Sequence, residues 1–134
     1  MSMGNSYIKN QSSLITHGCR ELRATAVDII DHALQSADPY AAVNRWVKLK
    51  ADVLSIGDLS FDLKDFERIF VIGAGKASRG IAQALDEILG DRITDGCFVL
   101  KHGDEGSLDH LRVIYAAHPI PDGNSQLGAS ALME

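Results

Sequence analysis

Hydrophobic residues in the first third of the chain recur mostly at three- and four-residue steps, the spacing of one helix face. Charged residues separate them within residues 13–36, so an amphipathic helix is predicted there. Asp38 and Pro39 form a helix start signal, because aspartate caps free N–H groups and proline at the first position loses no hydrogen bond. A second helix is therefore predicted from Tyr40 to about residue 49. The apolar positions of the first helix are Leu14, Leu22, Ala26, Ile29, Ile30, Ala33 and Leu34.

The pattern then changes to that of strands. Residues 52–63 alternate between apolar and polar in two short pieces broken at Gly57-Asp58, which predicts a strand or a small hairpin. Residues 69–72 are all apolar, which is typical of a strand buried on both faces of a parallel sheet. The remaining elements are predicted as a helix at about 76–89 that buries Ala77, Ile81, Ala84, Leu85 and Ile88 and is capped by Gly90, strands at 96–100 and 111–116, and a final helix starting near Asn124.

Strand, helix and strand in this order build a right-handed βαβ unit. The predicted fold class is therefore α/β, with a Rossmann-like, mostly parallel sheet flanked by helices. The N-terminal helices occupy about residues 13–50, and the α/β core occupies about residues 52–134.

The first core strand runs through a glycine turn straight into a helix, a junction where α/β folds hold anions. Gly73 and Gly75 can take positive φ and have no side chain, so an anionic oxygen can approach the N–H groups that open the helix. Lys76 adds a mobile positive charge at the positive end of the helix dipole. The alternative is a turn that needs its glycines for tight packing and binds nothing.

The loop at 117–123 is a second candidate for the site, because ligands of such sheets bind beyond the carboxyl ends of the strands. Its prolines restrict the backbone and hold His118 and Asp122 in a defined relation. The histidine could donate to an anion or a substrate hydroxyl, and the carboxylate could orient it or accept a proton. Alternatively, Asp122 only caps the final helix. Lys101 and His102 are weaker candidates on the neighbouring loop.

Composition narrows the class of protein. The 134 residues are 46% hydrophobic and 23% charged, which is ordinary for one globular domain. Thirteen basic residues against eighteen acidic ones give −5, and the basic residues are scattered, so nucleic acid is not expected as a partner. No stretch approaches the roughly 20 apolar residues of a membrane span, and residues 1–11 are polar, so a cytoplasmic protein is expected. Cys19 and Cys97 lack a metal or redox spacing, which predicts two reduced thiols.

Four segments together resemble the N-terminal part of the class II glycerate 2-kinases, a family whose members have often been labelled hydroxypyruvate reductases. They are residues 71–77 (VIGAGKA), 89–92 (LGDR), Gly96 with its strand, and 118–122 (HPIPD). The resemblance runs over residues 22–134. The GAGKA segment alone is a weak signal, but its pairing with HPIPD in this order and at this separation is fairly specific.

The resemblance implies transfer of the γ-phosphoryl group of ATP to the 2-hydroxyl of D-glycerate, with Mg²⁺, giving 2-phosphoglycerate. Family members have two domains with the active site between them, so this chain is expected to be a fragment without the C-terminal domain and inactive alone. The partners implied are glycerate and a nucleotide. Apolar surface that a second domain would cover is expected to favour self-association into a homo-oligomer.

The resemblance also implies roles for single residues. Lys76 carries over as the catalytic residue that holds a phosphate or the glycerate carboxylate. The backbone cradle carries over to Gly73, Ala74 and Gly75. His118 and Asp122 carry over only as residues lining the cleft. The general base and metal ligands are not identifiable within this sequence.

Three other functions remain open. A sugar-isomerase-type phosphosugar-binding domain would favour a serine- and threonine-rich loop at 101–106, which is lacking. An NAD(P)-dependent hydroxypyruvate reductase is suggested by the spacing of Gly73, Gly75 and Ser78, but Leu100-Lys101 stands where a ribose-binding acid is expected. The third is a non-catalytic, oligomerising domain.

Overall fold

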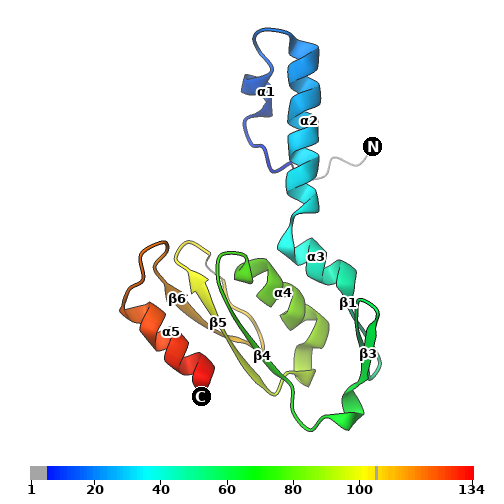
Figure 1. Ribbon diagram of the computed structural model, residues 1–134, viewed down its shortest axis with the longest axis vertical. Coiled ribbons are helices and arrows are strands. Elements are labelled where there is room, and N and C mark those ends of the chain that lie inside the picture. Colours follow the sequence, from blue (N-terminus) through cyan, green and yellow to red (C-terminus); the bar gives the residue numbers. More distant parts are fainter. Residues whose placement is uncertain (1–5, 105) are drawn as a thin grey trace. The chain divides into compact units, whose positions relative to one another are not determined.

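A computed structural model describes residues 6–104 and 106–134 of the chain. These residues form two compact units, one ending at Asp38 and the other running from Pro39 to Glu134. Figure 1 labels the helices and strands of both units.

In the first unit, a short helix and a long helix are joined by a turn at Gly18 (Figure 1). α1 spans Gln11–Leu14 and α2 spans Arg20–Ser36. Gly18 has a φ of 64°, a left-handed conformation that interrupts a helix. The prediction of one continuous helix from residue 13 is therefore wrong over residues 15–19, and it is confirmed over α2.

Asp31 on α2 holds the segment that precedes α1. Its Oδ1 accepts hydrogen bonds from the backbone N–H groups of Tyr7 at 2.8 Å and Ile8 at 3.2 Å, and its Oδ2 accepts one from the Gln35 amide at 2.8 Å. Burial opposes ionisation of Asp31, but these hydrogen bonds outweigh it and lower the pKa of the carboxyl group. An acidic side chain can therefore occupy a buried position of the helix.

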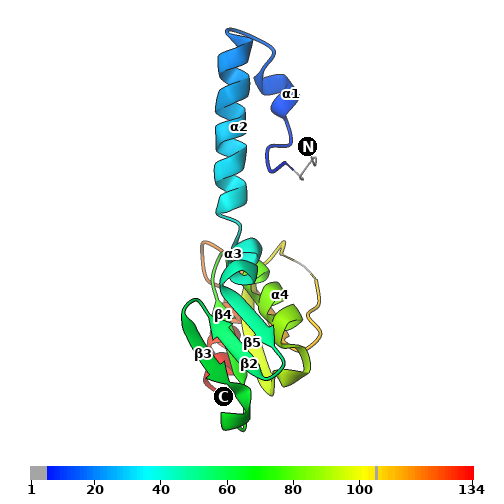
Figure 2. The same ribbon diagram turned by 90° about the vertical axis from the view of Figure 1, so that its right-hand side faces the viewer.

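The second unit begins with a helix and a small antiparallel sheet, seen in Figure 2. The start of α3 at Pro39 and the hairpin broken at Gly57-Asp58 are confirmed. The predicted continuation of the helix to residue 49 is wrong. Trp46 C=O accepts from the Gly57 N–H at 2.8 Å, and Val47 pairs with Ile56, so the following residues belong to a strand. The elements are α3 (Pro39–Trp46), β1 (Val47–Lys50), β2 (Val53–Ile56) and β3 (Leu59–Asp62), in the sheet order β1-β2-β3.

A parallel sheet of three strands, in the order β4-β5-β6, forms the rest of this unit. Its helices and strands confirm the predicted α/β class and the strand, helix, strand order. They are β4 (Phe70–Ala74), α4 (Ser78–Leu89), β5 (Asp95–Lys101), β6 (Arg112–Ala116) and α5 (Gly123–Met133), with 3₁₀ turns at Leu63–Asp65 and Gly90–Arg92. Gly90 has a φ of 49° and ends α4, as predicted. Ala77 was predicted to be buried on α4 but is exposed, because the helix starts at Ser78, two residues later than predicted.

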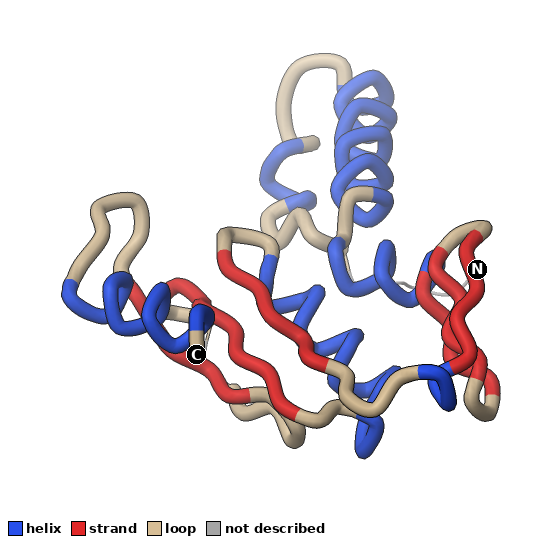
Figure 3. The backbone as a smooth tube through the Cα atoms, turned by 60° about the horizontal axis from the view of Figure 1, so that its bottom comes forward, coloured by secondary structure: helices blue, strands red, loops and turns tan. Residues whose placement is uncertain are grey.

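The sheet lies between two helices, α4 on one face and α5 on the other (Figure 3). The face beneath α4 holds the core, which consists of Val71, Ala82, Leu89, Ile93, Phe98, Leu100 and Leu111. On the opposite face, α5 approaches so closely at Gly128 that a Cβ there would lie 2.6 Å from Val99 Cγ2. Side chains of neighbouring residues in a strand point to opposite faces, so Phe98 packs on the α4 side and Val99 on the α5 side.

The prediction that β4 is buried on both faces is wrong. Val71 is buried, but Phe70 is 56% and Ile72 is 62% exposed. β4 is an edge strand, and α5 packs on β5 and β6. The part of the α5 face that β4 forms, with Phe70 and Ile72, is therefore open to solvent.

Two further features bear on the loops and the cysteines. Asp86, buried on α4, accepts hydrogen bonds from the backbone N–H groups of Asp109 and His110, both at 2.9 Å, and so fixes the return of the chain into β6. Cys19 and Cys97 are free thiols, as predicted, and burial raises the pKa of Cys97. Among the described residues, no helix is long and apolar enough to cross a membrane.

Candidate functional site

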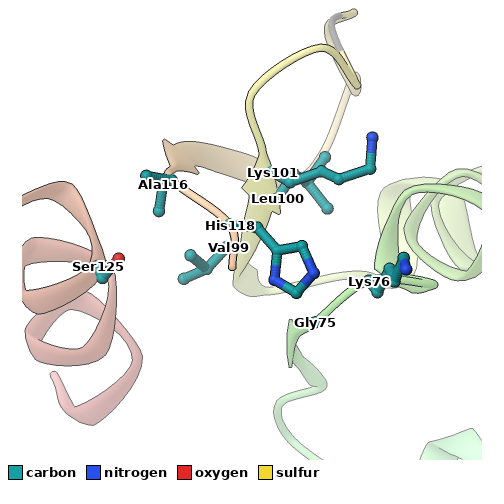
Figure 4. Close-up of a pocket in the computed structure, with 9 residues that line it drawn as sticks. Gly75, Lys76, Val99, Leu100, Lys101, Ala116, His118 and Ser125 are labelled. Carbon is teal, nitrogen blue, oxygen red and sulfur yellow. The ribbon is translucent and has the colours of Figure 1, made fainter. Parts of the chain in front are cut away.

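The carboxyl ends of β4, β5 and β6 meet at one edge of the sheet, and a pocket of about 130 Å³ opens there (Figure 4). Because both strand pairs are parallel, the loops that follow the three strands converge on this edge, as predicted. The N-terminus of α5 completes the wall. The lining residues are Gly75, Lys76, Val99, Leu100, Lys101, Ala116, Ala117, His118 and Ser125.

Gly75 makes the turn from β4 toward α4. Its φ of 124° lies in the region that favours glycine, as the sequence suggested. Its N–H donates to Val99 C=O at 3.4 Å and its C=O accepts from the Ser78 N–H at 3.2 Å, so these groups serve the turn. Among the described residues, no acceptor binds the N–H groups of Lys76 and Ala77, and no side chain caps α4. These two N–H groups lie on the turn that leads into α4 at Ser78, and an open turn at a helix N-terminus is suited to an anion.

Gly73 does not belong to this turn. It lies within β4 and does not have positive φ. A Cβ at this position would lie 2.3 Å from Phe98 Cε1, so the missing side chain makes room for a core ring. Neither Gly73 nor Ala74 lines the pocket. Gly73 is therefore a packing glycine, as the alternative interpretation of the turn proposed. Gly75, in contrast, lines the pocket.

Lys76 lies on the turn itself and its side chain is exposed. Within residues 6–104 and 106–134, no carboxylate forms an ion pair with its ammonium group, which is thus available to a ligand. Lys101, across the pocket, differs because its ammonium group pairs with the Asp104 carboxylate at 2.5 Å. Lys76 is the stronger candidate for binding an anion.

His118 brings an imidazole ring to the same pocket from the loop after β6. In Figure 4 the ring faces the Gly75 and Lys76 turn. The structure therefore brings together Gly75, Lys76 and His118, which lie more than forty positions apart at their extremes in the sequence. An imidazole N–H in this position can donate to an oxygen held at the turn.

Asp122 caps α5 instead of lining the pocket. Its Oδ1 accepts from the Ser125 N–H at 3.0 Å, while the Asp122 N–H donates to Ser125 Oγ at 3.1 Å, a reciprocal capping box. Partial desolvation opposes its ionisation, but hydrogen bonds from the backbone of Ala117 and Ser125 outweigh it and lower the pKa of the carboxyl group. His102 Nε2 lies 3.6 Å from Asp122 Oδ2 and links two of the loops. Of the two roles considered, the cap is the one observed.

Sequence reasoning did not single out two residues near this edge. Ser125 lines the pocket and is the N3 residue of the capping box that begins at Asp122. The capping pattern in the sequence could therefore have pointed to it. Arg79 lies in the first turn of α4, and its Nη1 is buried with no hydrogen-bond partner among the described residues. A Cβ at Gly106 would lie 2.5 Å from Arg79 Nη2, so the guanidinium packs directly against that loop. Only its nearness to Lys76 could have drawn attention to Arg79.

Residues 25–134 match the family model described as "Domain of unknown function (DUF4147)". The chain is 37% identical over 109 residues to a glycerate 2-kinase of Pyrococcus horikoshii, a match that covers 81% of this chain and 24% of that protein. It is 30% identical over 105 residues to a D-glycerate 2-kinase of Thermotoga maritima, covering 78% of this chain and 22% of the relative.

A solved structure supports the same relationship. The crystal structure of the PH0495 protein from Pyrococcus horikoshii OT3 matches with a TM-score of 0.68 and 37% identity, over 81% of this chain and 24% of that one. The chain thus spans about a quarter of the length of these relatives. The resemblance drawn from the GAGKA and HPIPD segments is confirmed. This chain belongs to the glycerate 2-kinase family and corresponds to its N-terminal region, which carries the DUF4147 domain.

Proposed function

We propose that this chain supplies the anion-binding part of an ATP-dependent kinase that phosphorylates the 2-hydroxyl of D-glycerate to 2-phosphoglycerate. One observation carries the proposal. Lys76, with no carboxylate partner in the described residues, lies beside the open N–H groups of the α4 N-terminus in a pocket between three strand ends. Relatives of the same family are named glycerate 2-kinases.

The size of the pocket suggests what it holds. Its volume of about 130 Å³ is well below the roughly 300–1,000 Å³ of sites that enclose a drug-sized ligand. It suits one phosphate group of ATP or the carboxylate of glycerate. ATP, when bound, supplies the phosphoryl group, and the rest of the two substrates would extend beyond this pocket.

The residues of the chain act by position and charge. Phosphoryl transfer depends mainly on alignment and on neutralising charge at the phosphoryl oxygens. The Lys76 ammonium and the N–H groups of Lys76 and Ala77 would bind an oxyanion, which the helix dipole further stabilises. His118 would donate to the same group from the opposite wall. The role of Lys101 is smaller, because Asp104 already neutralises its charge.

The described residues do not fit a magnesium site by themselves. No three His, Cys, Asp or Glu side chains come together among residues 6–104 and 106–134. Mg²⁺ prefers several oxygen ligands, usually from one or two carboxylates and from substrate phosphates. We therefore assign no residue of this chain to the metal.

The direct test is NMR titration of the ¹⁵N-labelled chain with inorganic phosphate, ADP and D-glycerate in separate series. We expect saturable shift changes at the amides of Lys76, Ala77 and Ser78. Lys76→Ala should weaken binding by at least about 5-fold, which is the loss of one charge-assisted contact. The matched control is Lys50→Ala, since Lys50 is an exposed lysine of β1, outside the residues that line the pocket.

Two outcomes of this titration would refute the proposal. In the first, the shifts appear only away from the α4 N-terminus. In the second, Lys50→Ala and Lys76→Ala weaken binding equally, which would indicate nonspecific attraction of anions. Either result would favour a non-catalytic domain.

A further inference from the structure

The outer edge of β4 presents unpaired backbone groups. β4 is an edge strand of the sheet, and the Gly75 N–H donates to Val99 C=O as the next rung of its ladder with β5. Backbone groups alternate in direction along a strand, so those of Val71 and Gly73 face β5. Those of Phe70, Ile72 and Ala74 consequently face away from the sheet.

An apolar surface accompanies this edge. Phe70 and Ile72 line a groove of about 300 Å³ together with Ala131 and Leu132 of α5, and the Arg112–Asp95 ion pair also borders it. α5 has no charged residue between positions 123 and 133. On its outer side, Leu127 and Met133 are 62% and 88% exposed. A helix that is apolar on several sides is typical of one buried on several sides.

The topology of the sheet predicts the direction of a strand that would follow α5. α4 covers one face of the sheet and α5 the other, so the chain has changed faces after β6. In a doubly wound sheet, this change of face sends the chain to the free side of the first strand by a right-handed connection. The last turn of α5 lies in the groove beside Phe70, the first residue of β4. A strand that enters there would run parallel to β4.

We propose that the free edge of β4 accepts a parallel, apolar β-strand, supplied by the polypeptide that follows this region in the longer relatives. Those relatives are about four times as long as the part that this chain matches, so they contain the polypeptide required. The strand would pair with Phe70, Ile72 and Ala74 and help to cover the exposed side chains of Phe70 and Ile72. Its carboxyl end would lie beside the Gly75 and Lys76 turn, where the strand order reverses. This inference concerns assembly of the sheet and goes beyond the proposed function.

A second copy of this chain is the competing occupant. Two β4 edges can pair only in antiparallel fashion about a twofold axis, and the register of greatest overlap is centred on Ile72. That register brings Arg68 and Lys76, which flank β4 at its two ends, close to Lys76 and Arg68 of the second copy. Positive charges gathered at both ends of the pair repel each other, so the charges disfavour this pairing. A parallel strand of another sequence does not duplicate these two charges.

Amide hydrogen exchange measured by NMR tests the proposal on two proteins. One is the chain alone, and the other is a fusion in which the sequence that follows the matched region in the Pyrococcus horikoshii relative is attached after Glu134. In the chain alone, the amides of Phe70, Ile72 and Ala74 should exchange rapidly and those of Val71 and Gly73 slowly. In the fusion, the first three should become at least about 100-fold more protected, which is a change expected for newly paired strand amides.

A proline variant provides the matched control. Ile72→Pro removes an N–H that faces away from β5, so the chain alone should keep its melting temperature, whereas the fusion should lose protection at Phe70 and Ala74. Val71→Pro removes a rung between β4 and β5 and should destabilise both proteins. If the fusion does not fold, a synthetic peptide of the same following sequence is titrated into the chain, with selective shifts expected at the three outward amides.

Three results would overturn the inference. One is unprotected outward amides in a folded fusion. Another is a peptide titration that leaves those amides unshifted. The third is protection of the same amides in the chain alone that rises with its concentration, because a second copy would then occupy the edge. None of these measurements depends on glycerate or ATP, so they stand apart from the test of the proposed function.

Discussion

Gly73 in β4 and Phe98 in β5 are paired in the sheet and fit together without room for one more carbon atom. A methyl group on Gly73 would lie 2.3 Å from Phe98 Cε1, and Phe98 is almost fully buried in the core. Gly75, two positions later, has a different reason to be glycine, namely its φ of 124°. Core packing therefore requires glycine at position 73, and backbone conformation requires it at position 75.

Gly73→Ala should destabilise the second unit because the added methyl group displaces the Phe98 ring. We expect a loss of about 1–3 kcal/mol in the free energy of unfolding, as for other overpacked cores. Urea unfolding followed by the fluorescence of Trp46, the single tryptophan, measures this loss. Gly123→Ala is the control, since a Cβ there meets nothing within 4 Å. Equal midpoints for both variants would mean that the core relaxes around the new methyl group.

Local sequence pattern predicted the α/β core well, because strand, glycine turn and helix each leave a short-range signal. It failed where burial depends on neighbours that are distant in sequence. Residues 69–72 show the pattern of a fully buried strand, yet Phe70 and Ile72 are exposed because β4 is at the edge of the sheet. Residues 47–49 continued a helical pattern, and only pairing with β2 makes them a strand.

The candidate site was predictable in place but not in detail. Topology alone brings the loops after parallel strands to one edge, which is why Gly75, Lys76 and His118 were correctly expected near each other. The sequence could not distinguish the two possible roles of Asp122, since the same carboxylate can bind a substrate or cap a helix. The structure shows the cap, through the hydrogen bonds of Asp122 with Ser125.

Lys76→Ala should leave stability almost unchanged. The side chain is exposed and has no ion-pair partner in the described chain, so the free energy of unfolding should change by no more than about 0.5 kcal/mol. Urea unfolding beside the unaltered chain measures this. A large loss of stability would instead assign Lys76 to packing and would weaken the case for a binding role.

Turnover needs more than this pocket. A pocket that accommodates one anionic group does not align two substrates, so the chain alone should form no 2-phosphoglycerate from ATP and D-glycerate. A chimera that carries this chain in place of the matched region of the Pyrococcus horikoshii relative should be active. In that chimera, Lys76→Ala should reduce kcat by at least about 100-fold. A coupled assay for 2-phosphoglycerate measures the activity of the chain alone, of the chimera and of its Lys76→Ala variant. Product from the chain alone would contradict the expected inactivity.

Asp86→Ala should release the segment that leads into β6. It leaves the backbone N–H groups of Asp109 and His110 without their acceptor, at a cost of about 1–3 kcal/mol. Hydrogen exchange at these two amides should accelerate before global unfolding is affected. Asp91→Ala, which removes an exposed carboxylate near His110, serves as the comparison and should leave both amides protected.

Asp122 should make stability depend on pH in a defined direction. Folding lowers the pKa of its carboxyl group below the ordinary value of 3.8, so the ionised form is favoured in the folded state. Its contribution is therefore complete above about pH 5 and is lost as the pH falls through the folded-state pKa. Asp122→Asn keeps a capping oxygen without a charge that titrates, because asparagine is also a good N-cap. The urea midpoint of the original chain should exceed that of Asp122→Asn at pH 7, and the difference should shrink below pH 3.8. Asp122→Ala should lower the midpoint at both pH values, since it also removes the cap. If the gap between the original chain and Asp122→Asn were the same at both pH values, the carboxylate charge would add nothing to the capping box.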